Sequence, residues 1–241
     1  MEGPSIVILK ELVKAFKHKK IIKVSGNAKI DLQRLEGQKI LDFKSWGKHF
    51  LICFPGFTLR IHFLMFGSYR INEKKNAVPR LSLQFSKGVL NFYSCSIKFI
   101  EEDLDNVYDW EADVMSGNWN PAKALRKLRS LPEEMVCDVL LNQEIFAGAG
   151  NIIKNEVLFR IFLHPEATLG NLKTARRKEL VETARAYSLE FYKWKKLFQL
   201  KKHWQIYRKK TCPRCHIPVV MKHTGYGKRI SFFCFNCQLL S

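Results

Sequence analysis

Four cysteines near the end of the printed sequence form two pairs of the type C-x2-C. Cys212 pairs with Cys215 and Cys234 with Cys237, and eighteen residues separate the two pairs. Because each pair fits on a tight turn, two pairs can place four thiolates around one tetrahedral zinc ion. We therefore predict one structural Zn2+ held by these four residues. Two disulfides are the alternative that the spacing alone leaves open.

The residues between the two cysteine pairs predict a short β-hairpin. Residues 219–221 and 230–233 are the expected strands, and residues 224–227 supply a turn. A hairpin of this size buries little core, so the metal must stabilise it. Its basic side chains are Lys222, His223, Lys228 and Arg229. A finger with this charge requires an acidic partner.

The whole chain is strongly basic. Among its 241 residues, 41 Lys and Arg outnumber 22 Asp and Glu, for a formal net charge of +19 and a pI near 9.7. This charge on a folded chain points to a polyanion, and nucleic acid fits better than an anionic membrane surface. No run of about 18 apolar residues predicts a membrane span. The N-terminus does not have the pattern of a signal peptide.

The remaining cysteines indicate the compartment. Cys53, Cys95 and Cys137 lie among apolar residues and are expected to be buried free thiols. Free thiols and zinc thiolates both persist in a reducing environment. We expect a monomeric cytoplasmic protein, associated with the nucleoid if the source is bacterial.

Hydrophobic periodicity predicts the scaffold that positions these sites. Residues 5–19 carry apolar side chains at helical spacing, and the helix that they predict ends before His18. Short β-rich runs separated by turns follow, which is typical of a β-sandwich or barrel. The runs are 21–24, 39–43, 49–54, 58–63, 68–71, 81–85, 89–93 and 96–100. Further helices are expected at 121–128, with Asn120 as cap and Pro121 in the first turn, and at 131–141, 152–159 and 174–196.

The order of these elements predicts an α+β protein with several domains. An N-terminal β-sandwich with a helix occupies residues 1–105, and an acidic linker occupies residues 106–120. A helical domain follows at 121–205, and the four-cysteine zinc finger takes 206–241.

Four motifs lie in one order along the chain. They are MEGP at residues 1–4, SWGKHF at 45–50, the segments LLNQ, AGAGNI, EVLF and HP within 140–165, and KRISFFC at 228–234. Together they resemble the formamidopyrimidine-DNA glycosylase and endonuclease VIII family of base-excision repair enzymes. The resemblance covers nearly the whole chain.

This resemblance implies a fold and a reaction. The fold is a β-sandwich domain followed by a helix–two-turn–helix domain and the zinc finger. The partner is double-stranded DNA with a damaged base or an abasic site. In the family, the N-terminal amine attacks C1′ of a damaged nucleotide that is flipped out of the duplex. The base leaves, a Schiff base forms, and β-elimination cuts the strand.

The resemblance also implies catalytic residues. The family usually begins Met-Pro-Glu-Gly-Pro and exposes the proline, whereas here Met1 stands in the place of that proline. A primary α-amine can still form an imine, and about a tenth of it or more is neutral at pH 7. Glu2 matches the carboxylate that protonates the sugar ring oxygen. Lys48 matches the lysine that reaches the lesion phosphate, and Ser5 replaces a second carboxylate.

Other matching residues would hold DNA. Residues 148–151 resemble a phosphate-binding turn, in which Asn151 would contact a phosphate and could cap the next helix. Arg229 matches the arginine that binds the phosphates beside the lesion, and Lys228 would add a general electrostatic contact.

An apolar run in the β-domain matches the wedge that fills the void left by a flipped base. Its residues are Leu64, Met65 and Phe66, although such a run can also be core. The segment between the 174–196 helix and Tyr207 is short and lacks glycine, so the long lesion-capping loop of the formamidopyrimidine enzymes is missing. This favours the endonuclease VIII branch and oxidised pyrimidines.

Three functions are compatible with these observations. The first is a bifunctional DNA glycosylase and abasic-site lyase. The second is a catalytically impaired relative that binds damaged or abasic DNA without cleavage, because Met1 replaces the usual nucleophile. A zinc-ribbon protein that binds RNA or the transcription machinery is a more distant third.

Overall fold

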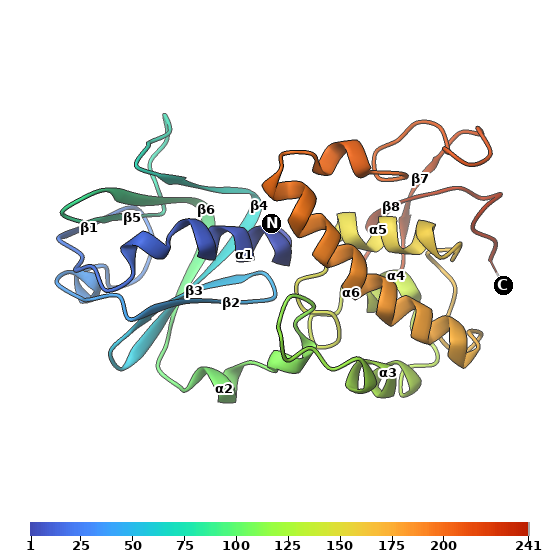
Figure 1. Cartoon of the computed structure of the whole chain (residues 1–241), viewed down its shortest axis with the longest axis horizontal. Helices are drawn as coiled ribbons and strands as arrows, with labels where there is room; N and C mark the ends of the chain where they lie inside the picture. Colours follow the sequence, from blue (N-terminus) through green and yellow to red (C-terminus); the bar gives the residue numbers. More distant parts are fainter. Residues whose placement is uncertain (241) are drawn as a thin grey trace. The chain divides into compact units, whose positions relative to one another are not determined.

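The computed structural model describes residues 1–240 and separates them into two compact units. The sheet unit contains Met1 and Ser5–Tyr108, and the helical unit contains Glu2–Pro4 and the chain from Asp109 onward (Figure 1). The change of unit at Tyr108 falls inside the stretch expected to be a linker. None of the helices in the described chain is both long and apolar enough to cross a bilayer.

The sheet unit is built on one antiparallel sheet of six strands, in the order β1-β5-β6-β4-β3-β2. The strands are β1 (Lys23–Ser25), β2 (Asp42–Trp46), β3 (His49–Phe54), β4 (Phe57–Ile71), β5 (Leu81–Gln84) and β6 (Val89–Ile100). The short segments η1 (Lys14–Phe16), η2 (Gln33–Leu35) and α2 (Leu104–Val107) complete it. The predicted α+β class with an N-terminal sheet domain is therefore confirmed.

Helix α1 (Gly3–Leu12) packs against this sheet. Ile6 and Leu9 on α1 are fully buried in one cluster with Phe50 and Phe92 of the sheet. The helix was expected to end before His18, but α1 ends at Leu12, because the chain changes to the 3-10 turn η1 and then to a left-handed residue, His18 (φ +63°). Residues 17–20 are three lysines and a histidine, so this stretch lacks the apolar side chains at helical spacing that would extend α1.

Two long strands replace four of the predicted short ones. Residues 58–63 and 68–71 both belong to β4, and residues 89–93 and 96–100 both belong to β6. The pairing register of β4 with β6 shifts between Phe63 and Ser68. This irregularity interrupts the alternation of side chains, which makes one strand look like two in the sequence.

The helical unit contains four α-helices and the hairpin. They are α3 (Pro121–Arg129), α4 (Val136–Val139), α5 (Asn151–Arg160) and α6 (Thr174–Lys196), with β7 (Val220–Thr224) and β8 (Arg229–Phe233). Short turns are η3 (Trp110–Ala112) and η4 (Leu200–His203). Helix α6 has the predicted bounds, and Asn120 caps α3 by accepting from the N–H of Lys123. Helices α5 and α6 lie side by side around a shared core (Figure 1).

The helix predicted at 131–141 is mostly wrong. Only Val136–Val139 is helical, and Met135 before it is extended (ψ 141°). The N–H groups of Val136 and Cys137 donate to the carbonyls of Ala167 and Pro165, which lie far along the chain. Tertiary hydrogen bonds therefore replace the first helical turn that the apolar spacing predicted.

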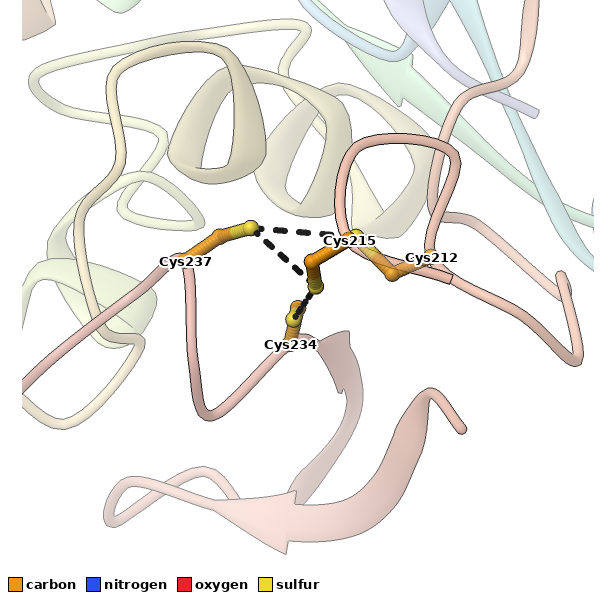
Figure 2. Close-up of side chains that lie close together, drawn as sticks. All are labelled: Cys212, Cys215, Cys234 and Cys237. Carbon is orange, nitrogen blue, oxygen red and sulfur yellow. Dashed lines mark hydrogen bonds between the residues drawn. The ribbon is translucent and has the colours of Figure 1, made fainter. Parts of the chain in front are cut away.

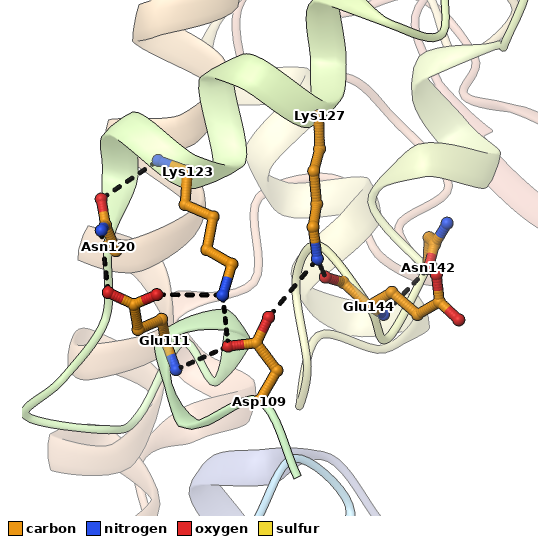
Figure 3. Close-up of polar contacts among 7 residues, drawn as sticks. All are labelled: Asp109, Glu111, Asn120, Lys123, Lys127, Asn142 and Glu144. Carbon is orange, nitrogen blue, oxygen red and sulfur yellow. Dashed lines mark hydrogen bonds and ion pairs between the residues drawn. The ribbon is translucent and has the colours of Figure 1, made fainter. Parts of the chain in front are cut away.

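Ion pairs hold the start of the helical unit against α3. Lys123 lies 2.8 Å from Asp109 and 2.9 Å from Glu111, and Lys127 lies 3.5 Å from Asp109 (Figure 3). Asn120 also donates to Glu111 at 2.9 Å. These side chains are partly exposed, so each pair adds little stability, but together they fix the path of residues 109–120.

A buried carboxylate anchors the segment that leads into the finger. Glu156 on α5 is fully buried and accepts hydrogen bonds of 2.8–3.1 Å from the N–H groups of Gln205, Ile206 and Tyr207. Three backbone donors thus depend on one side chain. An unsatisfied buried donor costs about 1–3 kcal/mol, so this side chain matters for the helical unit.

We expect Glu156→Ala to lower the free energy of unfolding by about 3 kcal/mol or more, because it leaves three donors without an acceptor. Glu156→Gln retains one oxygen and should cost less. Urea unfolding measures both. Glu182→Ala on the exposed face of α6 is the control and should change the free energy by less than about 0.5 kcal/mol. Equal effects of Glu156→Ala and Glu182→Ala would contradict the anchoring role.

Candidate functional site

The side chain of Glu2 binds the N-terminus of helix α5. One carboxylate oxygen, Oε1, accepts from the N–H of Ile152 at 2.7 Å, and Oε2 accepts from Ile153 at 3.2 Å. The N–H of Gly3 donates to the carbonyl of Gly148 at 2.8 Å. The first N–H groups of a helix lack partners within it, and this end of the helix favours negative charge. Glu2 is therefore held in one orientation directly after Met1.

This contact bears on two details of the turn at residues 148–151, which are the partner of the helix amides and the cap. The amides of Ile152 and Ile153 bind Glu2 rather than an external phosphate. The cap position of α5 is Gly150, so Asn151 is not the cap. Asn151 instead donates from Nδ2 to the carbonyl of Ile230 at 3.0 Å, while its buried Oδ1 has no partner among the described residues. Its contact with a DNA phosphate stays a prediction.

Gly150 makes room for the carboxylate. A Cβ atom at this position would lie 2.5 Å from both Cγ and Cδ of Glu2, closer than side chains tolerate. Any other residue would push Glu2 off the helix. The sequence showed only a glycine before a helix, which gave no sign of this role.

Helix α5 also holds strand β8 of the finger. Lys154 is fully buried and donates from Nζ to the carbonyl of Ile230 at 3.1 Å and to Ser231 Oγ at 2.8 Å. The N–H of Phe232 donates to Asn155 Oδ1 at 2.6 Å. Burial lowers the pKa of Lys154 to about 8. The backbone that carries Arg229 is thereby fixed to the same helix that binds Glu2.

The turn of the hairpin is attached to α4. The carboxylate of Asp138 accepts from the N–H of Tyr226 at 2.7 Å and from Gly227 at 3.0 Å. Lys228 and Arg229, which follow this turn, are both exposed. Exposed cations on a fixed backbone suit contacts with phosphate, although those contacts stay a prediction.

A basic groove of about 570 Å³ lies beside Asn151 in the helical unit. Its lining is Asn151, Tyr207, Arg208, Lys209, Lys210, Val219, Met221, Ile230 and Phe232. The rings of Tyr207 and Phe232 meet edge to face, with centroids 5.2 Å apart. Only the fold shows that Arg208, Lys209 and Lys210 share a wall with Asn151. Cationic side chains interleaved with aromatic rings are typical of a nucleic-acid surface.

In the sheet unit, Lys48 belongs to the tight turn between β2 and β3, where Gly47 has φ +52°. Burial, then the charges of Lys48, the N-terminal amine and Arg60, lower the pKa of His62 on β4. Lys48, the amine of Met1 and His62 therefore share one positive environment. His62 was missed in the sequence because an isolated histidine in a strand gives no signal.

The predicted wedge residues are not part of the core. Leu64, Met65 and Phe66 are 53%, 73% and 89% exposed. They lie where β4 shifts register against β6, and Phe66 has φ +67°. Exposed apolar side chains at a strand irregularity can enter a partner, so this geometry is compatible with the predicted role.

The four predicted cysteines converge as a metal site would require. Their sulfur atoms all lie within 4.8 Å of one another, with Cys215 Sγ 3.3 Å from Cys234 and Cys212 Sγ 3.8 Å from Cys237 (Figure 2). Tetrahedral zinc with bonds near 2.3 Å spaces its sulfurs by about 3.8 Å. All seven cysteines are free thiols, which argues against the two disulfides. The donor set and spacing therefore fit one zinc ion.

Comparison with known proteins decides the family. The model of the formamidopyrimidine-DNA glycosylase N-terminal domain matches residues 6–99. Endonuclease 8-like 3 of Mus musculus is 31% identical over 216 residues, which is 86% of this chain. Endonuclease 8-like 2 of Bos taurus is 35% identical over 196 residues, or 75% of the chain. The chain belongs to the formamidopyrimidine-DNA glycosylase and endonuclease VIII family.

Solved structures of the family confirm the fold. A viral DNA glycosylase has a TM-score of 0.87 at 20% identity. The formamidopyrimidine-DNA glycosylase of Lactococcus lactis, bound to DNA with an AP site, has a TM-score of 0.87 at 21% identity. Each comparison covers 99% of this chain and 100% of the other. The chain spans only 36% and 58% of the length of the two endonuclease 8-like relatives named above.

We expect one zinc ion per chain, and its removal should unfold the finger while the sheet unit stays folded, because the two have separate cores. Metal analysis and two-dimensional NMR, before and after a chelator, measure both effects. Cys215→Ser should lose the zinc, whereas Cys53→Ser should keep it. Two disulfides found by thiol alkylation and mass spectrometry would contradict the site.

Substituting Gly150→Ala should displace Glu2 and lower the free energy of unfolding by about 1–3 kcal/mol, since two helix amides lose a charged acceptor. Hydrogen exchange at Ile152 and Ile153 should become faster. Gly117→Ala is the control, because a Cβ there meets no atom within 4 Å. Unchanged exchange in Gly150→Ala would show that Glu2 is held in some other way.

Proposed function

We propose that this chain is a base-excision-repair DNA glycosylase with abasic-site lyase activity. The observation that carries the proposal is the fixed carboxylate of Glu2, one peptide bond from the amine of Met1 and bound to two amides of α5. An amine with an adjacent, oriented carboxylate provides the nucleophile and the proton carrier that glycosidic cleavage needs.

The proposed reaction begins at the amine of Met1. The amine attacks C1′ of the damaged nucleotide, the bond from C1′ to the base breaks, and the base leaves with the bonding electrons. Glu2 takes the proton that the amine loses and passes it to the ring oxygen, which opens the sugar and leaves an imine. Loss of the proton at C2′ then expels the 3′ phosphate, which is the lyase step.

The other predicted residues would hold the DNA. Lys48 would bind the phosphate of the lesion, and Arg229 with Asn151 would bind neighbouring phosphates along the basic groove. Lys228 would add charge. The exposed side chains of Leu64, Met65 and Phe66 would fill the space left by the flipped nucleotide.

The substrate we propose is an oxidised base in double-stranded DNA, most favourably a pyrimidine. Two observations support this choice: the short connection from α6 to Tyr207 and the similarity to proteins named endonuclease 8-like. We further propose a monomer in the reducing cytoplasm, associated with the nucleoid if the source is bacterial, in keeping with seven cysteines that form no disulfide.

A second candidate is a binding protein that recognises damaged or abasic DNA without cutting it. Met1 in place of proline favours it, and so does Ser5. Ser5 is 5% exposed and stands where the family usually has a carboxylate. This candidate keeps every phosphate contact and differs only in the chemistry at the amine.

Borohydride trapping on an abasic duplex tests the proposal. Wild-type protein with Met1 as its verified first residue should form a covalent adduct, located on Met1 by mass spectrometry. Glu2→Gln should slow trapping about 10²- to 10⁴-fold. Glu102→Gln, an exposed carboxylate, is the matched control. Tight binding without any adduct would overturn the enzyme and support the binding protein.

A further inference from the structure

The C-terminus of α6 ends in a Schellman motif. The N–H of Phe198 donates to the carbonyl of Lys195 at 3.1 Å, and the N–H of Gln199 donates to that of Trp194 at 2.8 Å. Phe198 takes the left-handed position of this motif, with φ +58°. Glycine is the usual residue here, because a Cβ atom in the left-handed region comes too close to the following carbonyl oxygen.

The ring of Phe198 is hardly buried by the fold, so almost no packing offsets the strain of its backbone. It is 97% exposed, the most exposed large apolar side chain of the described residues, and its neighbour Leu197 is 64% exposed. A strained backbone that carries an exposed ring is unfavourable for the isolated protein. Such residues are frequent where a partner provides the missing contacts.

A second phenylalanine, Phe162, has the same left-handed backbone, but its ring has a contact within the protein. Phe162 follows α5 in the same motif, with φ +54°. The N–H of Phe162 donates to the carbonyl of Phe159, and the N–H of Leu163 donates to that of Leu158. The guanidinium of Arg214 lies 3.8 Å from the centre of the Phe162 ring, a cation–π contact. The two positions share residue type and backbone, so Phe162 provides an internal control for Phe198.

The surroundings of Phe198 identify the chemistry of the partner. Glu190 is the last acidic residue of the sequence, and twelve Lys and Arg follow it. Those nearest to Phe198 in the chain are Lys193, Lys195, Lys196, Lys201 and Lys202, all exposed. Trp194 stacks on His203, with ring centroids 4.1 Å apart, and this contact joins the two ends of the segment that contains Phe198. The partner must combine a flat apolar face with negative charge.

We propose that Phe198 is a stacking platform for an unpaired base of bound DNA. A nucleobase offers a π-face to the ring, and its phosphates face the lysines. A protein partner would require a larger apolar area than these two side chains. The inference rests on the DNA binding of the proposed function, but it does not depend on the chemistry at Met1.

Two duplexes that differ only in one bulged thymidine test this platform. Wild-type protein should prefer the bulged duplex, measured by fluorescence anisotropy. Phe198→Gly should weaken binding to the bulged duplex about 5- to 100-fold and so abolish the preference, because stacking on a base is lost. Its Tm should equal or exceed that of the wild type, since glycine suits the motif. Phe198→Trp should retain the preference, and so should Phe162→Gly.

Three results would overturn the platform: no preference in the wild type, an unchanged preference in Phe198→Gly, or an equal loss on both duplexes. Borohydride trapping separates this test from that of the proposed function. A preference that depends on Phe198 without trapping would support the platform and reject the enzyme. If the wild type is trapped by borohydride but Phe198→Gly keeps the preference for the bulged duplex, the enzyme is supported and the platform is rejected.

Discussion

The polar contacts of helix α5 are the constraint on which the rest of the helical unit depends. Its first turn binds the carboxylate of Glu2, which brings the start of the chain to the middle of the sequence. Its buried face carries Lys154, Asn155 and Glu156, which bind β8 and the segment at 205–207. Buried polar groups must be satisfied, so each of these bonds fixes its partner strictly. One helix of ten residues thereby positions a candidate catalytic carboxylate and the backbone of the finger that carries Arg229.

The finger depends on this helix through hydrogen bonds, in addition to the four cysteines that fit a zinc site. Four cysteines hold its base, but the hairpin itself is bonded to α5 through Ile230 and to α4 through Asp138. Its own apolar core is small, with Phe159 of α5 as one of its few fully buried side chains. Polar contacts therefore stabilise the finger where a larger domain would rely on a hydrophobic core, and a zinc ion at the four cysteines would add to them. This division leaves the outer face of the finger available for its exposed cations.

Much of the scaffold could be predicted where local signals were strong. The bounds of α6 and the cap of α3 follow from periodicity and from Asn120 with Pro121, which act within a few residues. The helix at 131–141 failed because carbonyls of Pro165 and Ala167 compete for its first amides. Strands β4 and β6 were divided because the shift near Phe63 hides their continuity. In each case, hydrogen bonds to a distant segment determined the secondary structure, and the local sequence pattern does not show those bonds.

The sequence by itself determined the family, the four cysteines that fit a zinc site and the basic character, because these depend on residue types and their spacing. It also placed Met1 beside Glu2, which one peptide bond guarantees. Only the tertiary structure decided that the amides of Ile152 and Ile153 bind Glu2, and that Gly150 leaves the space for this. Only the structure distinguished Phe198, which is exposed, from Phe162, which is paired with Arg214. Burial and hydrogen bonding between distant residues depend on the folded path of the chain, and spacing along the sequence does not record that path.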